Sequence, residues 1–170
     1  MTIDSATPAT HLVSDPHGLR FETDVAAHPA TTARLGGRIV VGIHGSDSSI
    51  AAARYAIKLA DALDGTVVAV TSWMFPDAYG AMMVAIDSPA DNARGIADDA
   101  TNALFGNTRP DWFSADIVQG TAGRALIEAS QGAEMLVVGG RGHSGLAGLL
   151  LGSVSAHCAE NAACPVLVVH

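Results

Sequence analysis

The chain has 170 residues and is 49% hydrophobic, which is enough for one well-packed domain and short for two. Its formal net charge is -8, so it lacks the basic surface that sequence-independent binding to DNA or RNA requires. No basic region followed by an apolar core opens the chain, and no apolar run approaches the roughly 18 residues of a membrane span. Cys158 and Cys164 form no CxxC pair, so we expect both to be reduced. We therefore expect one cytoplasmic domain with neither nucleic acid nor membrane as partner.

Residues 1–36 are rich in Thr, Ala, Pro and His and show no sustained helical or strand period. This composition predicts a disordered N-terminal arm. His11, His17 and His28 have spacings that match no recognised metal-ligand set, so we expect solvated side chains. A partner-binding or regulatory role of the arm stays open.

The folded domain is expected to start at Gly37. Residues 38–43 are an apolar run that suits a strand buried on both faces, and residues 45–48 supply a turn and a helix cap. Apolar residues then recur at helical spacing over 49–63, and residues 66–73 form a second buried strand. A strand, helix and strand in this order predict a parallel pair with a right-handed crossover.

The middle of the chain continues the alternation. Residues 75–89 are broken by Pro and Gly, and we interpret them as a loop or short helix over a cleft. A helix is predicted over 90–105, a strand over 112–118 and a helix over 123–131.

The stretch from Met135 to Val169 carries the chemistry. A buried strand at 135–138 is followed by a glycine loop at 139–145, a helix with Ser153 as its N-cap candidate, and a last strand at 165–169. Glycines let a backbone approach a ligand closely, and the first turn of a helix offers unpaired N–H donors and a positive dipole end. Such a segment can hold an anion.

Three known motifs fail on this loop. The Gly140-x-Gly142-x-x-Gly145 pattern lacks the following βαβ unit and acidic residue of a dinucleotide-binding fold. A P-loop needs a lysine before its Ser or Thr, and Ser153 follows a glycine directly. A nucleophile elbow needs a glycine where Leu146 stands.

A fourth pattern fits at every position. Gly139-x-x-Gly142, nine residues, and then Gly152-Ser153-Val154 resemble the nucleotide-binding branch of the universal stress protein family, and so do the strand and turn at 39–46. The resemblance covers residues 37–170 and implies a single α/β domain, often dimeric. Five strands alternating with helices predict an open, doubly wound, five-stranded parallel sheet, for which the family implies the order 3-2-1-4-5 with helices on both faces. Ligands of such sheets bind at the carboxyl ends of the strands, where the strand order reverses.

The resemblance implies that the loop holds the phosphates of ATP, alone or with Mg²⁺, and it implies no catalytic residue. Ser72 would face the adenine, Ser155 would occupy the second helical position, and Arg141 would add a cation unless it is solvated. The alternative role of Ser153 is that of a helix cap only. The implied nucleotide-binding residues are Gly42, Ile43, His44, Ser72, Val138, Gly139, Arg141, Gly142, His143, Gly152, Ser153, Val154 and Ser155.

His44 departs from the family pattern, in which an aspartate usually ends the first strand and accepts hydrogen bonds from the ribose. A neutral imidazole has one acceptor nitrogen, and a protonated one has none. We expect weaker, pH-dependent or base-altered binding. Asp47 could substitute, but a role as helix cap explains it more simply.

The sequence thus predicts an ATP-binding stress-response regulator that acts through its nucleotide-dependent state or partner. Two alternatives stay open: a dimeric interaction module that binds no nucleotide, and a slow ATPase. The apolar run at 165–169 is expected to be an edge strand, which favours a homodimer.

Overall fold

The computed structural model of the chain describes residues 36–75, 88–140 and 151–170. All of them belong to one compact unit, Thr31–His170. The arm predicted over 1–36 and the loop predicted over 75–89 lie almost entirely outside the described residues, so these two predictions stay open.

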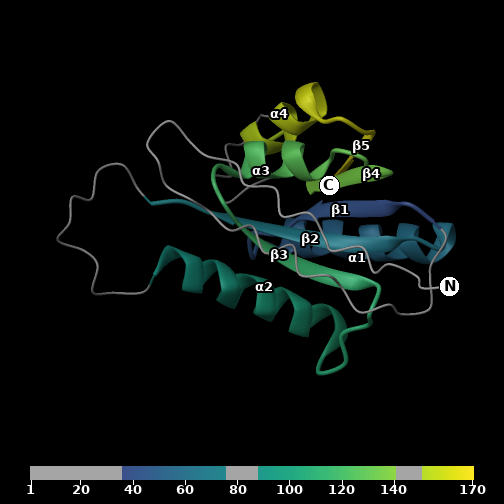
Figure 1. The fold of residues 1–170 in the computed structure, drawn as a ribbon, viewed down its shortest axis with the longest axis horizontal. Coiled ribbons are helices and arrows are strands. Elements are labelled where there is room, and N and C mark those ends of the chain that lie inside the picture. The colour runs from purple at the N-terminus through teal and green to yellow at the C-terminus, as the bar shows by residue number, and fades with distance from the viewer. Residues whose placement is uncertain (1–35, 76–87, 141–150) are drawn as a thin grey trace, which may run out of the picture. The chain divides into compact units, whose positions relative to one another are not determined.

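Strands and helices alternate along the described residues, as the sequence predicts. The strands form one all-parallel sheet in the order β3-β2-β1-β4-β5, which confirms the predicted fold class and strand order (Figure 1). The elements are β1 (Arg38–Gly42), α1 (Asp47–Leu63), β2 (Thr66–Trp73), α2 (Pro89–Phe105), β3 (Phe113–Gln119), α3 (Ala122–Ala129), β4 (Met135–Gly139), α4 (Ser153–Asn161) and β5 (Val166–Val169).

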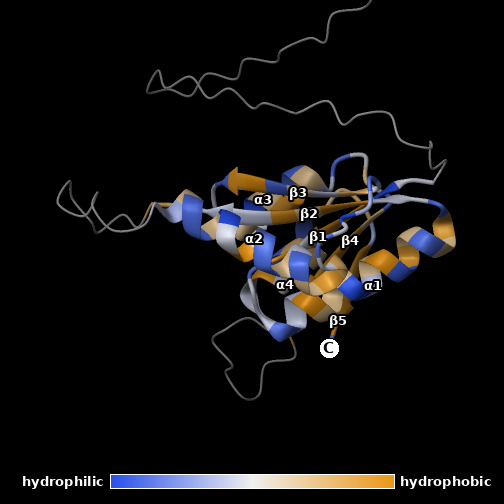
Figure 2. Cartoon of the chain, turned by 90° about the horizontal axis from the view of Figure 1, so that it is seen from below, coloured by the Kyte–Doolittle hydropathy of each residue, from blue (hydrophilic) through white to orange (hydrophobic). Residues whose placement is uncertain are grey.

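Helices cover both faces of the sheet. Helices α1 and α2 pack on one face over a core that includes Ile39, Val41 and Val137, while α3 and α4 pack on the other over Val40 and Leu136. Successive strand residues point to opposite faces, so a strand covered on both sides must be apolar throughout. The hydropathy colouring shows this contrast, with α1 carrying both polar and apolar residues (Figure 2).

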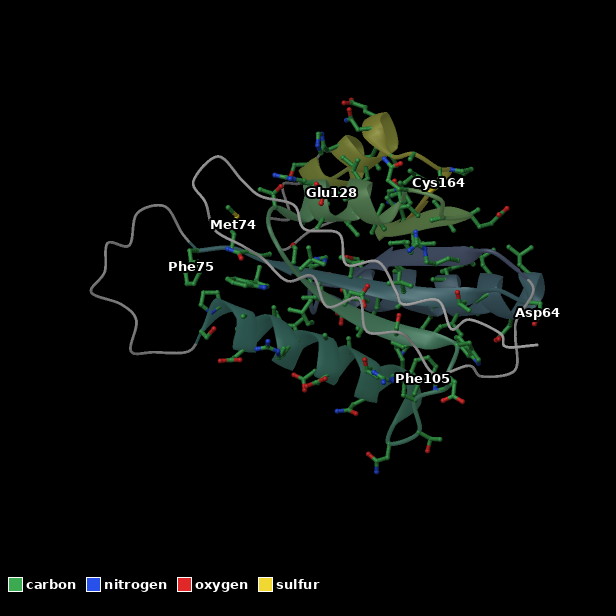
Figure 3. The ribbon with its side chains drawn as sticks, in the orientation of Figure 1. Asp64, Met74, Phe75, Phe105, Glu128 and Cys164 are labelled. Carbon is green, nitrogen blue, oxygen red and sulfur yellow. The ribbon has the colours of Figure 1, made fainter. Side chains whose placement is uncertain are left out.

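A cluster of aromatic rings lies at the C-terminal end of α2. Phe105, which Figure 3 labels at the end of α2, makes edge-to-face contacts with Trp112, at 5.8 Å between ring centroids, and with Phe113, at 4.8 Å. Such pairs favour this geometry because a positive ring edge meets a negative ring face. This aromatic cluster holds the C-terminal end of α2 in place. The first turns of α2 therefore lie near the carboxyl end of β2.

Most predicted boundaries are correct to within one or two residues, but two caps are wrong. Ser46 caps α1, because its hydroxyl accepts a hydrogen bond from the Ser49 N–H at 3.2 Å, and Asp47 is the first helical residue. Gly152 has an extended backbone and is the N-cap of α4, so Ser153 opens the helix rather than capping it. Ser155 is consequently the third helical residue and not the second.

Candidate functional site

The connection from β1 to α1 builds the first wall of the site. Ile43 continues the ladder by donating its N–H to the Val70 carbonyl at 2.9 Å, and its side chain is buried. The chain then turns through Gly45, whose φ of +81° favours glycine. This turn brings Ser46 Oγ to 2.9 Å from His44 Nε2. The imidazole is thereby oriented beside the end of β1.

The connection from β4 to α4 builds the second wall. Gly140 donates its N–H to the Val169 carbonyl at 2.7 Å and accepts from the Gly152 N–H at 2.9 Å. The bond from Gly152 ties together the two ends of the connection from β4 to α4, and the bond to Val169 holds Gly140 beside β5. Residues 141–150, which include the predicted Arg141, Gly142 and His143, lie outside the described residues.

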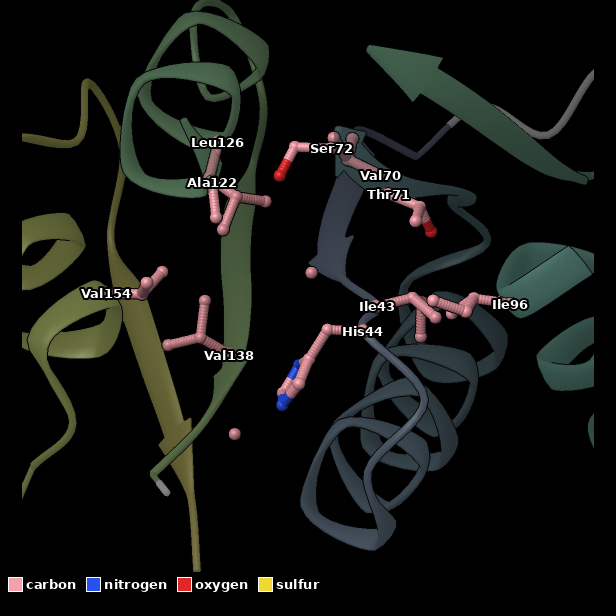
Figure 4. Close-up of a pocket in the computed structure, with 12 residues that line it drawn as sticks. Ile43, His44, Val70, Thr71, Ser72, Ile96, Ala122, Leu126, Val138 and Val154 are labelled. Atoms are coloured by element: carbon pink, nitrogen blue, oxygen red, sulfur yellow. The ribbon is translucent and has the colours of Figure 1, made fainter. Parts of the chain in front are cut away.

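The first turn of α4 stands at the edge of this wall. Gly152 has no side chain that could accept a hydrogen bond. The N–H groups in the first turn of α4 are therefore not capped by the N-cap residue. Ser155 is buried, and its hydroxyl donates to the Gly152 carbonyl at 2.9 Å. The Ser155 side chain therefore holds the entry to the helix, whereas Val154 is exposed and faces the pocket (Figure 4).

A pocket of about 270 Å³ lies between the two walls, at the carboxyl ends of β1, β2 and β4. Strands β1 and β4 are neighbours in space although two other strands separate them in sequence, so the pocket occupies the switch point of the sheet. Its described lining residues are Gly42, Ile43, His44, Val70, Thr71, Ser72, Ile96, Ala122, Leu126, Val138, Gly139 and Val154.

The pocket has two apolar sides. In Figure 4, Ile43, Thr71 and Ile96 lie to one side and Leu126 and Val138 to the other. Among the described lining residues, His44 is the one titratable side chain. Apolar walls with a few polar groups are typical of pockets that bind small organic molecules.

The structure brings together a large part of the predicted site. Seven predicted residues line the pocket, and Gly152, Ser153 and Ser155 lie in the adjoining start of α4. The seven are Gly42, Ile43, His44, Ser72, Val138, Gly139 and Val154.

Sequence reasoning missed the other lining residues, which are Val70, Thr71, Ile96, Ala122 and Leu126. Thr71 had a usable signal, because it is the first polar residue after the apolar run of its strand. Ile96 had none, since its place on the apolar stripe of a helix does not indicate what that stripe covers.

Metal-ligand clusters and membrane-spanning helices are both absent from the described residues. No group of three or more His, Cys, Asp or Glu side chains is placed there to hold a metal ion. No helix in the same ranges is long and apolar enough to cross a membrane.

Burial raises the pKa of both cysteine thiols, which lie on the face of the sheet that α3 and α4 cover. Cys158 is fully buried, and this burial raises the pKa of its thiol. The pKa of Cys164 is raised as well, again mainly by burial. A raised pKa lowers the thiolate fraction at neutral pH, and the thiolate is the nucleophilic form of cysteine.

An open parallel sheet with helices on both faces and a pocket at its switch point defines a doubly wound α/β protein. The model of the universal stress protein family matches residues 37–170, and the chain belongs to this family.

The relatives agree with this assignment. The chain is 33% identical over 142 residues to a universal stress protein of Mycolicibacterium smegmatis and 35% identical over 135 residues to universal stress protein Rv2624c of Mycobacterium tuberculosis. These matches cover 78% and 77% of the chain but 47% of each relative. The chain therefore spans about half the length of the curated relatives it matches.

Solved structures show the same fold. A universal stress protein in complex with cAMP matches with a TM-score of 0.55 and 33% identity, over 79% of this chain and 97% of that one. UspA from Lactobacillus plantarum matches with a TM-score of 0.65 and 18% identity, over 82% of this chain and all of that one.

Proposed function

We propose that the pocket binds an adenine nucleotide, ATP in the first place, and that the chain is a cytoplasmic stress-response regulator whose state or partner changes with nucleotide occupancy. The observation that carries this proposal is the junction of an apolar pocket with a helix start that has no side-chain cap. Val154 belongs to both, because it lines the pocket and is the second residue of α4.

The helix start supplies the groups for the phosphates. The N–H groups of Ser153 and Val154 have no partner within the helix, and the dipole of α4 places partial positive charge at the same point. Gly139 and Gly140 bring the adjoining backbone close without side-chain bulk. A protein of net charge -8 can bind phosphates in this way, since the donors are backbone groups.

The apolar part of the pocket suits the nucleoside. Ile43, Ile96, Leu126 and Val138 offer contact for a heterocyclic base and a sugar, and Ser72 and His44 offer polar atoms. The similar structure that contains cAMP supports an adenine nucleotide as the ligand class.

The first test is chemical. Nucleotide released from the purified protein by heat or acid is identified by mass spectrometry, and the stripped protein is titrated calorimetrically with ATP, ADP and AMP, with and without Mg²⁺. Stoichiometric adenine nucleotide supports the proposal. A protein that is empty and shows no heat with any of the three would leave a dimeric interaction module, whereas recovery of ADP after incubation with ATP would identify a slow ATPase.

A pair of variants tests where the phosphates lie. Val154→Glu puts a carboxylate in the first turn of α4, where it stabilises the helix but repels phosphate. Val154→Gln has nearly the same shape without the charge. We expect the Glu variant to bind ATP at least about tenfold more weakly than the Gln variant, a difference of about 1.4 kcal/mol, with both equally folded. Equal affinities would place the phosphates elsewhere.

A further inference from the structure

The buried hydroxyl of Thr71 has no hydrogen-bond partner in the described part of the chain. Among the described residues, its Oγ1 is the one buried side-chain oxygen or nitrogen in this condition, and Thr71 is 2% exposed. The buried hydroxyl of Ser130, by contrast, donates to the Ile127 carbonyl at 2.7 Å and accepts from the Ala163 N–H at 2.8 Å. Folded proteins rarely leave such a group unpaired, because its lost hydration is not repaid.

The position of Thr71 connects this hydroxyl to the pocket. Alternation along β2 places Thr71 on the same face as Ala69, toward α1 and α2, and sends Ser72 to the opposite face. Thr71 lines the pocket beside Ile43 and Ile96, and in Figure 4 the Thr71 and Ser72 oxygens point to different sides of it. Each apolar side of the pocket thus has one hydroxyl of its own.

We infer that Thr71 recognises the base of the bound nucleotide. The heterocycle packs against Ile43 and Ile96, and the Thr71 hydroxyl donates to a ring nitrogen and accepts from the neighbouring amino group of adenine. A hydroxyl can do both at once, and adenine presents an acceptor nitrogen and an amino group side by side. The ligand then supplies the partner that Thr71 Oγ1 lacks. This inference rests on the proposed function of the same pocket.

The inference predicts two effects of opposite sign for Thr71→Val, which replaces the hydroxyl with a methyl group of similar size. The ligand-free protein should gain stability, because an unpaired buried hydroxyl is removed. A rise of about 2–4 °C in its thermal midpoint is expected for a chain of this size. Adenine nucleotides should bind about tenfold more weakly, because the base loses its hydrogen-bond partner. A Thr71 that does not contact the base would still give the gain in stability, but without the loss of nucleotide affinity, so the affinity is the effect that decides.

The experiment measures thermal unfolding without ligand and calorimetric binding of ATP and of inorganic tripolyphosphate, a probe that has phosphates but no base. Thr66→Val is the matched control, since it makes the same change at the other end of the same strand, away from the pocket. Thr71→Ser keeps the hydroxyl and should keep the affinity for ATP. It also serves as the test variant if Thr71→Val fails to fold, because serine must then bind ATP like the wild type.

The outcomes separate the inference from the proposed function. If the wild type binds ATP and Thr71→Val binds it equally well, Thr71 does not recognise the base, while the nucleotide site stands. If Thr71→Val weakens ATP and tripolyphosphate equally, the phosphate region has been disturbed and the assignment is overturned. If the wild type binds no adenine nucleotide, the proposed function itself fails. A loss confined to ATP, with Thr66→Val unchanged, supports the inference.

Discussion

Gly139 at the end of β4 lies directly against Ser48 in the first turn of α1. A Cβ atom on Gly139 would lie 2.9 Å from the carbonyl carbon, the carbonyl oxygen and the Oγ of Ser48. Two of these three atoms belong to the backbone, which cannot rotate away as a side chain can. The contact therefore sets the distance between the two connections that form the walls of the pocket.

The close approach predicts that Gly139→Ala destabilises the protein. The added methyl group must push α1 away from β4, and overpacking of this kind costs about 1–3 kcal/mol. Urea unfolding measures the change, with an unchanged slope as evidence that only the stability has moved.

Gly95→Ala is the matched control for this prediction. Gly95 lies in the exposed interior of α2, and a Cβ atom there meets nothing within 4 Å. Alanine favours the helix by up to about 1 kcal/mol, so this variant should be more stable than the wild type. The same substitution thus gives opposite signs at two sites, and a Gly139→Ala protein as stable as the wild type would show that the contact is not tight.

Replacing His44 with aspartate is expected to strengthen the binding of adenosine. The resemblance to the family suggests an aspartate here, and the imidazole with Ser46 Oγ 2.9 Å from its Nε2 stands in that place. We expect His44→Asp to bind adenosine about tenfold more tightly, because a carboxylate accepts hydrogen bonds from both ribose hydroxyls. Adenosine lacks phosphate, so the new charge repels no part of this probe.

The comparison ligand for His44→Asp is 2′,3′-dideoxyadenosine, which lacks the two hydroxyls. The gain should vanish with it, and His44→Asn, which has one neutral acceptor oxygen, should lie between the wild type and the Asp variant. Calorimetric titration of the three proteins with the two nucleosides gives the answer. Equal gains for both nucleosides would mean that residue 44 does not contact the ribose.

The sequence was sufficient for the fold because its strands are buried on both faces. Such strands must be continuously apolar, and glycines and polar turns mark where they begin and end. Their positions and their alternation with helices can therefore be predicted from the sequence. The caps were harder. Ser46 and Asp47 are both good cap residues, and only the bond from the Ser49 N–H to Ser46 Oγ distinguishes them.

The site residues that could be predicted are those at strand ends and glycine turns. Strand ends and glycines have local signals, which is why His44 and Gly139 could be predicted to line one cleft. Ile96 reaches the pocket because α2 packs across the end of β2, and a contact between distant segments leaves no mark in either of them. Thr71 has a local signal, but its unpaired hydroxyl becomes visible only in three dimensions.

Strand β5 lies at the edge of the sheet, where a second copy of the chain could pair with it. It pairs only with β4 among the described strands, and the carbonyls of Pro165 and Val169 accept from Leu136 and Gly140 of that neighbourhood at 2.9 and 2.7 Å. Backbone groups alternate in direction along a strand, so the N–H of Val168 points away from the sheet. A free edge of this kind is a template for another strand.

We expect a homodimer that depends on this outward N–H. Val168→Pro removes the donor without breaking the ladder to β4, because proline is tolerated where an edge N–H faces outward. Sedimentation at micromolar concentration should give a dimer for the wild type and a folded monomer for Val168→Pro. Val168→Thr keeps the N–H and should stay dimeric. A Val168→Pro protein that still sediments as a dimer would show that the copies associate through another surface, and a wild-type mass that stays monomeric at every concentration would exclude the dimer itself.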